Sequence, residues 1–173
     1  AAEKEEIERI LAQLSHRLGT LTDQLLEDVV RLSDLDRAYA KAEYSYKNKC
    51  TRPRLNDRGV INIQKGRHPL LDAKTAVPVS VALGKDYDIL LVSGPNTGGK
   101  TVTLKMCGLF CLMACCGIFL PAADGTEVSV FKKIFCDIGD TQSIEENLST
   151  FSSHIKNIIG ITREADAESL VLI

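Results

Sequence analysis

The sequence predicts an α/β domain with a parallel sheet, preceded by a long helical arm. Apolar residues recur at alternating steps of four and three over residues 7–25, the period of a packed helical face. Farther along the chain, apolar runs of strand length alternate with segments of helical pattern. A glycine-rich turn at residues 94–101 separates one such run from the helix that follows it.

Length and composition fit a single domain with a substantial hydrophobic core. The chain has 173 residues, of which 45% are hydrophobic. Its 21 basic and 23 acidic residues give a net charge of -2. This balance excludes an overall positive field that would attract nucleic acid, so any such contact needs a local patch or residues outside this stretch.

Four of the six cysteines fall at helical spacing within an apolar run: Cys107, Cys111, Cys115 and Cys116. They do not form a spaced disulfide framework. Helical neighbours among them could bind a soft metal, but no His or acid lies between them and the flanks are apolar, so we expect these thiols to be reduced and buried. Gly117 and Pro121 interrupt the run, which is too short for the ~20 residues of a membrane span. The charged N-terminus has no signal-peptide pattern, so we expect a cytoplasmic location and no membrane contact.

The N-terminal part of the chain predicts the helical arm. Its apolar residues line one face: Ile7, Leu11, Leu14, Leu18, Leu21, Leu25, Leu32, Leu35 and Tyr39. No proline precedes Pro53, so we expect one helix of about forty residues, or two collinear helices with a bend at Gly19. The arm is either a solvated helix that packs one face on its own protein or a lever that transmits motion.

Composition changes at the segment TRPRLNDRG, whose Pro, Asn, Asp and Gly are typical of a connector. We therefore divide the chain near Arg52, into an arm of residues 1–52 and an α/β part of residues 53–173. Strands are predicted at residues 60–63, 79–83, 89–93, 127–130, 133–137 and 170–173, and helices at about 100–116 and 150–165. The unbroken apolar run 89–93 is typical of a strand buried in a parallel sheet.

The segment GPNTGGKT, residues 94–101, has the spacing of a phosphate-binding P-loop and lies between an apolar run and a helix. Glycines allow successive N–H groups to surround a phosphate, and the helix presents its positive end to the same anion. Lys100 is expected to reach the β- and γ-phosphates of ATP, and Thr101 to place its hydroxyl on Mg²⁺. These two are the candidate catalytic residues, with Thr101 as the candidate metal ligand. The alternative is a glycine-rich turn that only caps a helix.

The candidate ATP-binding residues of this segment are Gly94, Pro95, Asn96, Thr97, Gly98, Gly99, Lys100, Thr101 and Val102. Hydrolysis also needs a metal-holding acid, which usually follows a second buried strand, the Walker B strand. The apolar run SLVLI, residues 169–173, matches that strand, and the sequence stops before the acids. We therefore expect this polypeptide to bind ATP with Mg²⁺ and to hydrolyse it poorly.

Several segments resemble the ATPase domain of the MutS family: GPNTGGKTVTLK, GIFLPA, FCDIGDTQSIEENLSTFSSHIKNI and SLVLI. The variants TVTLK, DIGDTQSI and LSTFSSH are more similar to its second bacterial branch, the paralogue with a C-terminal Smr domain, than to the mismatch-repair branch. The similarity extends upstream through RHPLL and LSDLDRAYAKAEY, so it covers nearly the whole chain.

The resemblance implies an ABC-type P-loop ATPase sheet, truncated after the Walker B strand, in a protein that forms a homodimer through its ATPase domain. Ser149 and Thr150 match the family's signature loop, which reaches the nucleotide of the partner subunit. A Ser-Thr pair that opens a helix offers hydroxyl and N–H groups to an anion. Asn96 would face phosphate, while Asp140 and Gln142 would organise magnesium or water, or else form a surface turn.

The histidines are interpreted mainly as structural. His68, in RHPLL, is expected to close a turn, with an adenine contact as the alternative. His154 has helical neighbours, Ser153 and Asn157, as ordinary partners. The three histidines of the chain are too scattered for a metal site.

For the whole protein, the resemblance implies a nucleotide-driven dimeric switch that acts on branched DNA or on ribosomes, in suppression of recombination or rescue of collided ribosomes. These partners would bind through regions largely outside this stretch, such as the clamp and the Smr nuclease module. Two alternatives stay open: mismatch repair, and an interaction module that binds through the apolar face of residues 7–39 and uses the P-loop as a folded support. A kinase or another P-loop ATPase would lack the DIGDTQSI and STFSSH segments.

Overall fold

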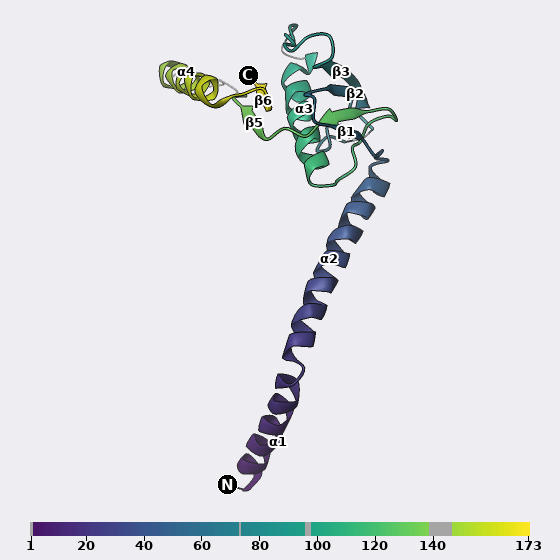
Figure 1. The fold of residues 1–173 in the computed structure, drawn as a ribbon, viewed down its shortest axis with the longest axis vertical. Coiled ribbons are helices and arrows are strands. Elements are labelled where there is room, and N and C mark those ends of the chain that lie inside the picture. Colours follow the sequence, from purple (N-terminus) through teal and green to yellow (C-terminus); the bar gives the residue numbers. More distant parts are fainter. Residues whose placement is uncertain (1, 73, 96–97, 139–146) are drawn as a thin grey trace. The chain divides into compact units, whose positions relative to one another are not determined.

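The structure is a computed structural model that describes residues 2–72, 74–95, 98–138 and 147–173, with the backbone alone for 147–151 (Figure 1). The chain divides into two compact units, Ala1–Glu43 and Tyr44–Ile173. Each unit is described below by itself. The division into functional domains near Arg52 stays a prediction.

The first unit is helical. It contains α1, Ala2–Gly19, and most of α2, Thr22–Lys47. The break between the two helices follows Gly19, which confirms the predicted position of the interruption. The apolar face that the sequence predicts is exposed within this unit, with Leu11 at 57% and Leu35 at 67%. Both interpretations of the arm therefore stay predictions.

The second unit holds two sheets among its described residues. Strands β1 (Arg54–Asn56), β2 (Ile61–Gly66), β3 (Val79–Leu83) and β4 (Glu127–Ser129) form one sheet in the order β1-β4-β2-β3, and β5 (Lys133–Cys136) pairs with β6 (Ser169–Leu172). The pairs β1–β4 and β5–β6 are parallel, whereas β2 is antiparallel to β3 and β4. The prediction of a parallel sheet is wrong around β2, because a parallel neighbour needs a long crossover, usually a helix, and the described residues between β2 and β3 form turns.

Two stretches differ from their predicted structure. Residues 54–56, predicted as part of a connector, form β1 at an edge of the sheet, a position where a preceding Pro53 is tolerated. Residues 89–93, predicted as a buried strand, form no strand, and the Ile89 and Leu91 side chains are 85% and 88% exposed. No strand of the described residues pairs with this run, and an apolar strand is buried only where neighbours flank it.

Helix α3, Lys100–Cys115, packs against the four-stranded sheet and forms the core with it. Phe110 of α3 and Ile63 of β2 are both 0% exposed. Helix and strand approach closely at Gly66, where an added Cβ would lie 3.0 Å from Phe110 Cε2 and 3.1 Å from Met106 Sδ. The added Cβ would also lie 2.6 Å from Ile63 Cγ2 of the same strand, so the packing favours a residue without a side chain at the end of β2.

The cysteines of α3 follow its buried face only in part. Cys107 and Cys111 are buried as predicted, and burial raises the pKa of Cys107 to about 11 and that of Cys111 to about 12, which disfavours their thiolates. Cys115 and Cys116 are exposed, contrary to the prediction, because the buried face of α3 ends at Ala114. All six cysteines are free thiols.

The turn after β3 generates a prediction about stability. Gly84 has φ 84°, and a Cβ added there would lie 2.2 Å from the Gly59 carbonyl oxygen, a backbone atom that has little freedom to move. Gly125 has nearly the same φ, 85°, but an added Cβ would meet no atom within 4 Å, so Gly125→Ala is the matched control. We expect both substitutions to carry the backbone cost of about 1–2 kcal/mol, and Gly84→Ala to lose about 1–3 kcal/mol more through the collision.

Urea unfolding of the two variants measures this difference in the free energy of unfolding. Equal losses for Gly84→Ala and Gly125→Ala would contradict a role for the close contact with Gly59.

Candidate functional site

The glycine-rich loop leads directly into the N-terminus of α3. Gly98 N–H donates to the Pro95 carbonyl over 2.9 Å, which closes a tight turn before the helix. Gly99, the residue before α3, has φ 74° in the left-handed region, and Gly94 has φ 148°. An added Cβ at either glycine would meet open space, so these two positions need glycine for their backbone conformation and not for packing.

The loop brings a positive charge to the positive end of a helix. The Lys100 ammonium donates to the Gly94 carbonyl, six residues earlier, and so lies against the loop that it follows. Thr103 N–H donates to the Gly99 carbonyl over 2.9 Å, the first bond of the helical ladder, so the preceding amides point out of the helix end. The first turn of α3 carries no acidic residue. The arrangement therefore suits an anion, and its residues fit the phosphates of a nucleotide.

The remaining predicted nucleotide-binding residues lie at several places. Thr101 is half-buried in the first turn of α3, and Val102 beside it is 39% exposed. Pro95 and Gly98 are exposed in the loop. Asn96 and Thr97 lie outside the described residues, so their predicted contacts stay predictions.

The predicted signature residues lie at the start of α4, Asn147–Glu164. Ser149 and Thr150 fall in its first turn, and the description of the structure stops at their backbone. Asp140 and Gln142 lie outside the described residues. The roles that the resemblance implies for these four residues stay predictions.

His68 closes a turn, as predicted. Its Nδ1 accepts a hydrogen bond from Leu70 N–H over 3.3 Å, and its carbonyl accepts one from Leu71 N–H over 3.0 Å. Burial, and secondly the nearby Lys105 charge, lower the pKa of His68, so its imidazole is neutral at neutral pH and Nδ1 is free to accept. The adenine contact stays a prediction.

Sequence reasoning missed a polar cluster between the end of β5 and α4. His154 Nδ1 lies 2.9 Å from Asp137 Oδ2, and Asn157 Nδ2 donates to Asp137 Oδ1 over 3.2 Å. His154 was expected to use its helical neighbours, but its partner is a carboxylate 17 positions earlier in the chain. The spacing of residues within a helix gives no information about a partner elsewhere in the chain. An acidic residue directly after a strand, as Asp137 is, is a sequence signal that could have pointed to this contact.

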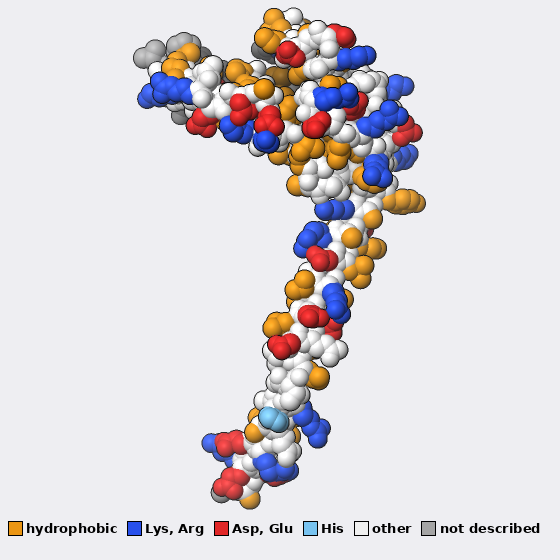
Figure 2. Space-filling view, in the orientation of Figure 1, with side chains coloured by type: hydrophobic (Ala, Val, Ile, Leu, Met, Phe, Trp, Pro, Cys, Tyr) orange, Lys and Arg blue, Asp and Glu red, His pale blue; other side chains and the backbone are white. Residues whose placement is uncertain are grey.

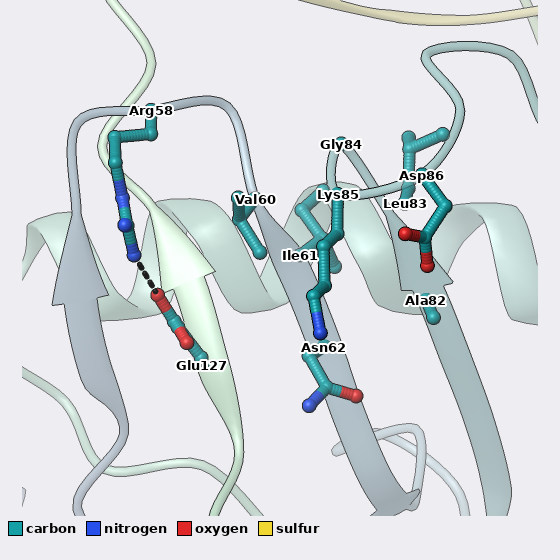
Figure 3. A pocket seen from close by; sticks show the side chains of 10 residues that line it. All are labelled: Arg58, Val60, Ile61, Asn62, Ala82, Leu83, Gly84, Lys85, Asp86 and Glu127. Atoms are coloured by element: carbon teal, nitrogen blue, oxygen red, sulfur yellow. Dashed lines mark hydrogen bonds and ion pairs between the residues drawn. The ribbon is translucent and has the colours of Figure 1, made fainter.

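A separate cavity of about 630 Å³ lies on the four-stranded sheet, at the start of β2 and the end of β3 (Figure 3). At one side of it Arg58 forms an ion pair with Glu127 of β4 over 3.3 Å. Lys85 and Asp86 extend from the turn after β3 at the other side. None of the described residues of the loop 94–102 lines this cavity, so it is separate from the described part of the phosphate-binding loop.

Two properties of the described part of the chain concern membrane spanning and metal binding. None of its helices is long and apolar enough to cross a membrane. Within the same residues, no three or more His, Cys, Asp or Glu side chains are grouped so that they could hold a metal ion.

Comparisons with known proteins agree with the geometry. Residues 90–173 match the family MutS domain V. The chain is 54% identical to the Endonuclease MutS2 of Geobacillus sp. (strain WCH70) over 98% of its own length and 22% of that protein. It is 54% identical to the Endonuclease MutS2 of Acetivibrio thermocellus over 98% of its length and 21% of that protein, and 50% identical to that of Caldicellulosiruptor bescii over 99% and 22%.

The chain thus spans 21–22% of the length of these relatives. Its glycine-rich loop and α3 both lie within the matched domain, as do β5, α4 and β6. The domain match, together with identity of about one half along nearly the whole chain, supports a MutS2-type protein.

Proposed function

We propose that the loop before α3 binds Mg-ATP and that the chain is the ATP-binding part of a MutS-like, DNA-associated ATPase. One observation carries the proposal: a left-handed Gly99 starts α3 while the Lys100 ammonium reaches back to the Gly94 carbonyl. The match of residues 90–173 to MutS domain V supports it independently.

The chemistry of the loop suits a triphosphate. Amides at the start of α3 point toward the anion, and the helix dipole adds to their attraction. The Lys100 ammonium lies against the Gly94 carbonyl of this loop, and on nucleotide binding it would turn from there to the β- and γ-phosphates. Thr101, the second residue of α3, would offer its hydroxyl to Mg²⁺.

For the whole protein we propose a homodimeric switch. In it, Ser149 and Thr150 at the start of α4 would contact the nucleotide of the partner subunit. ATP can drive such a switch only by binding one state more tightly than the other. The relatives are named endonucleases, and we propose branched DNA or the ribosome as the substrate that the switch grips.

A second candidate function is an interaction module. The exposed apolar face of α1 and α2 favours it, since Leu11, Leu18 and Leu35 are 57%, 60% and 67% exposed. Hydrophobic side chains, in orange, are visible at the surface of these helices in Figure 2. Soluble proteins seldom expose a continuous apolar stripe unless another surface covers it. In this alternative the partner binds the arm whether or not nucleotide is present.

Substitution of the loop lysine tests the proposed function. We expect Lys100→Ala to weaken binding of a fluorescent ATP analogue by about 100-fold, because two or more charge-assisted hydrogen bonds to phosphate are lost. Equilibrium titration with and without Mg²⁺ measures the affinity. Lys85→Ala, which removes a lysine at the separate cavity, is the matched control and should bind normally. Undiminished binding by Lys100→Ala would end the assignment of the loop.

Sedimentation separates the switch from the interaction module. The switch predicts that Mg-ATP raises the dimer fraction and that Leu11→Glu on the exposed face of α1 leaves this response intact. The interaction module predicts association that ignores Mg-ATP and that Leu11→Glu abolishes, because a buried, unpaired carboxylate is costly. Sedimentation velocity of the full-length wild type and of its Leu11→Glu variant, each with and without Mg-ATP, distinguishes these outcomes.

A further inference from the structure

We propose that Asp137 is a positioning residue that couples the end of β6 to α4, and that His154 and Asn157 are its contacts on the helix. The inference rests on the proposed function, because α4 begins with the predicted signature residues Ser149 and Thr150. Asp137, His154 and Asn157 all lie outside the phosphate-binding loop.

Asp137 hydrogen-bonds to two different elements. It follows β5 directly, and its backbone N–H donates to the carbonyl of Leu172, the last residue of β6, over 2.8 Å. Its carboxylate accepts from His154 Nδ1 through Oδ2 and from Asn157 Nδ2 through Oδ1, over 2.9 Å and 3.2 Å. A single residue thus joins the β5–β6 sheet to α4.

The carboxylate that accepts these bonds is largely shielded from water. The Asp137 side chain is 7% exposed and that of His154 is 30% exposed, while Asn157 lies at the surface. Hydrogen bonds from His154 and then from Asn157 hold the pKa of Asp137 below its usual value, so the group is a carboxylate and His154 Nδ1 is the donor. A shielded carboxylate that lost its donors would have few waters to replace them.

The two donors share one face of α4. Asn157 follows His154 by three positions, so the two side chains project from neighbouring turns on the same side. Fixing His154 and Asn157 therefore fixes the rotation of the helix about its axis. That rotation sets the direction in which the first turn of α4, with Ser149 and Thr150, faces.

Through its backbone bond to Leu172, Asp137 is also connected to α3, the helix that follows the phosphate-binding loop. Leu172 packs against α3 at Gly108, where an added Cβ would lie 2.6 Å from Leu172 Cδ1. Helix α3 begins at Lys100. A packed connection thus runs from the helix that starts with the P-loop lysine, through β6 and Asp137, to the helix that starts with the signature residues.

Variants of the full-length protein test the role of Asp137. We expect His154→Ala and Asp137→Ala to lower kcat for ATP hydrolysis by about 10- to 100-fold, as misplacement of a positioning group does, while the Kd of a fluorescent ATP analogue changes by less than about twofold. His154→Asn should restore most of kcat, because its amide nitrogen takes the position of Nδ1 relative to Cβ. Lys156→Ala, an exposed neighbour on α4, is the control and should match the wild type.

Hydrogen exchange supplies a readout that does not depend on ATPase activity. In His154→Ala, amides of residues 152–164 should exchange faster than in the wild type, whereas those of β5 and β6 should not change. Unchanged exchange in α4, or a kcat for His154→Ala within about twofold of the wild type, would overturn the inference. A fall in ATP affinity as large as the fall in kcat would also overturn it, since the residue would then act on nucleotide binding.

Failure of the proposed function would give a different experimental result. If Lys100→Ala still bound ATP, the loop assignment would be lost, yet the exchange data would still decide whether Asp137 holds α4 in place.

Discussion

Packing of α3 against β2 is the contact on which the rest of the second unit depends. Phe110 and Ile63 are completely buried, and full burial of such side chains contributes about 1.5–3 kcal/mol each. Exposed ion pairs such as Lys132–Glu168 contribute little, because water and salt screen them. The core therefore decides where α3 lies, and because α3 begins at Lys100, it also decides where the phosphate-binding loop stands.

The loop in turn depends on backbone conformation more than on side-chain contacts. Gly99 adopts a left-handed conformation that a side chain would strain, and this conformation turns the chain into the helix. Lys100 then returns to the Gly94 carbonyl, so its charge lies beside the loop at the start of the helix. A site of this kind is local in sequence, which explains why a short motif predicts it.

Helix α4 is held in a different way, by polar contacts at its middle and at its C-terminal end. Asp137 holds His154 and Asn157, and Lys133 of β5 donates to the Glu164 carbonyl at the last turn over 3.0 Å. A cation at that end also complements the helix dipole. Such contacts are directional and few, so they can fix the orientation of a helix that contributes little to the core.

The sequence by itself determined the elements whose signals are local: the two helices that meet at Gly19, β3, α3 and the conformation-dependent glycines of the loop. Only the tertiary structure decided which neighbours each element has. It made β2 antiparallel, gave residues 89–93 no partner among the described strands, exposed Cys115 and paired His154 with the carboxylate that directly follows β5. The physical reason is that periodicity, capping and backbone preference act within a few residues, whereas burial and polar pairing depend on what the folded chain brings alongside.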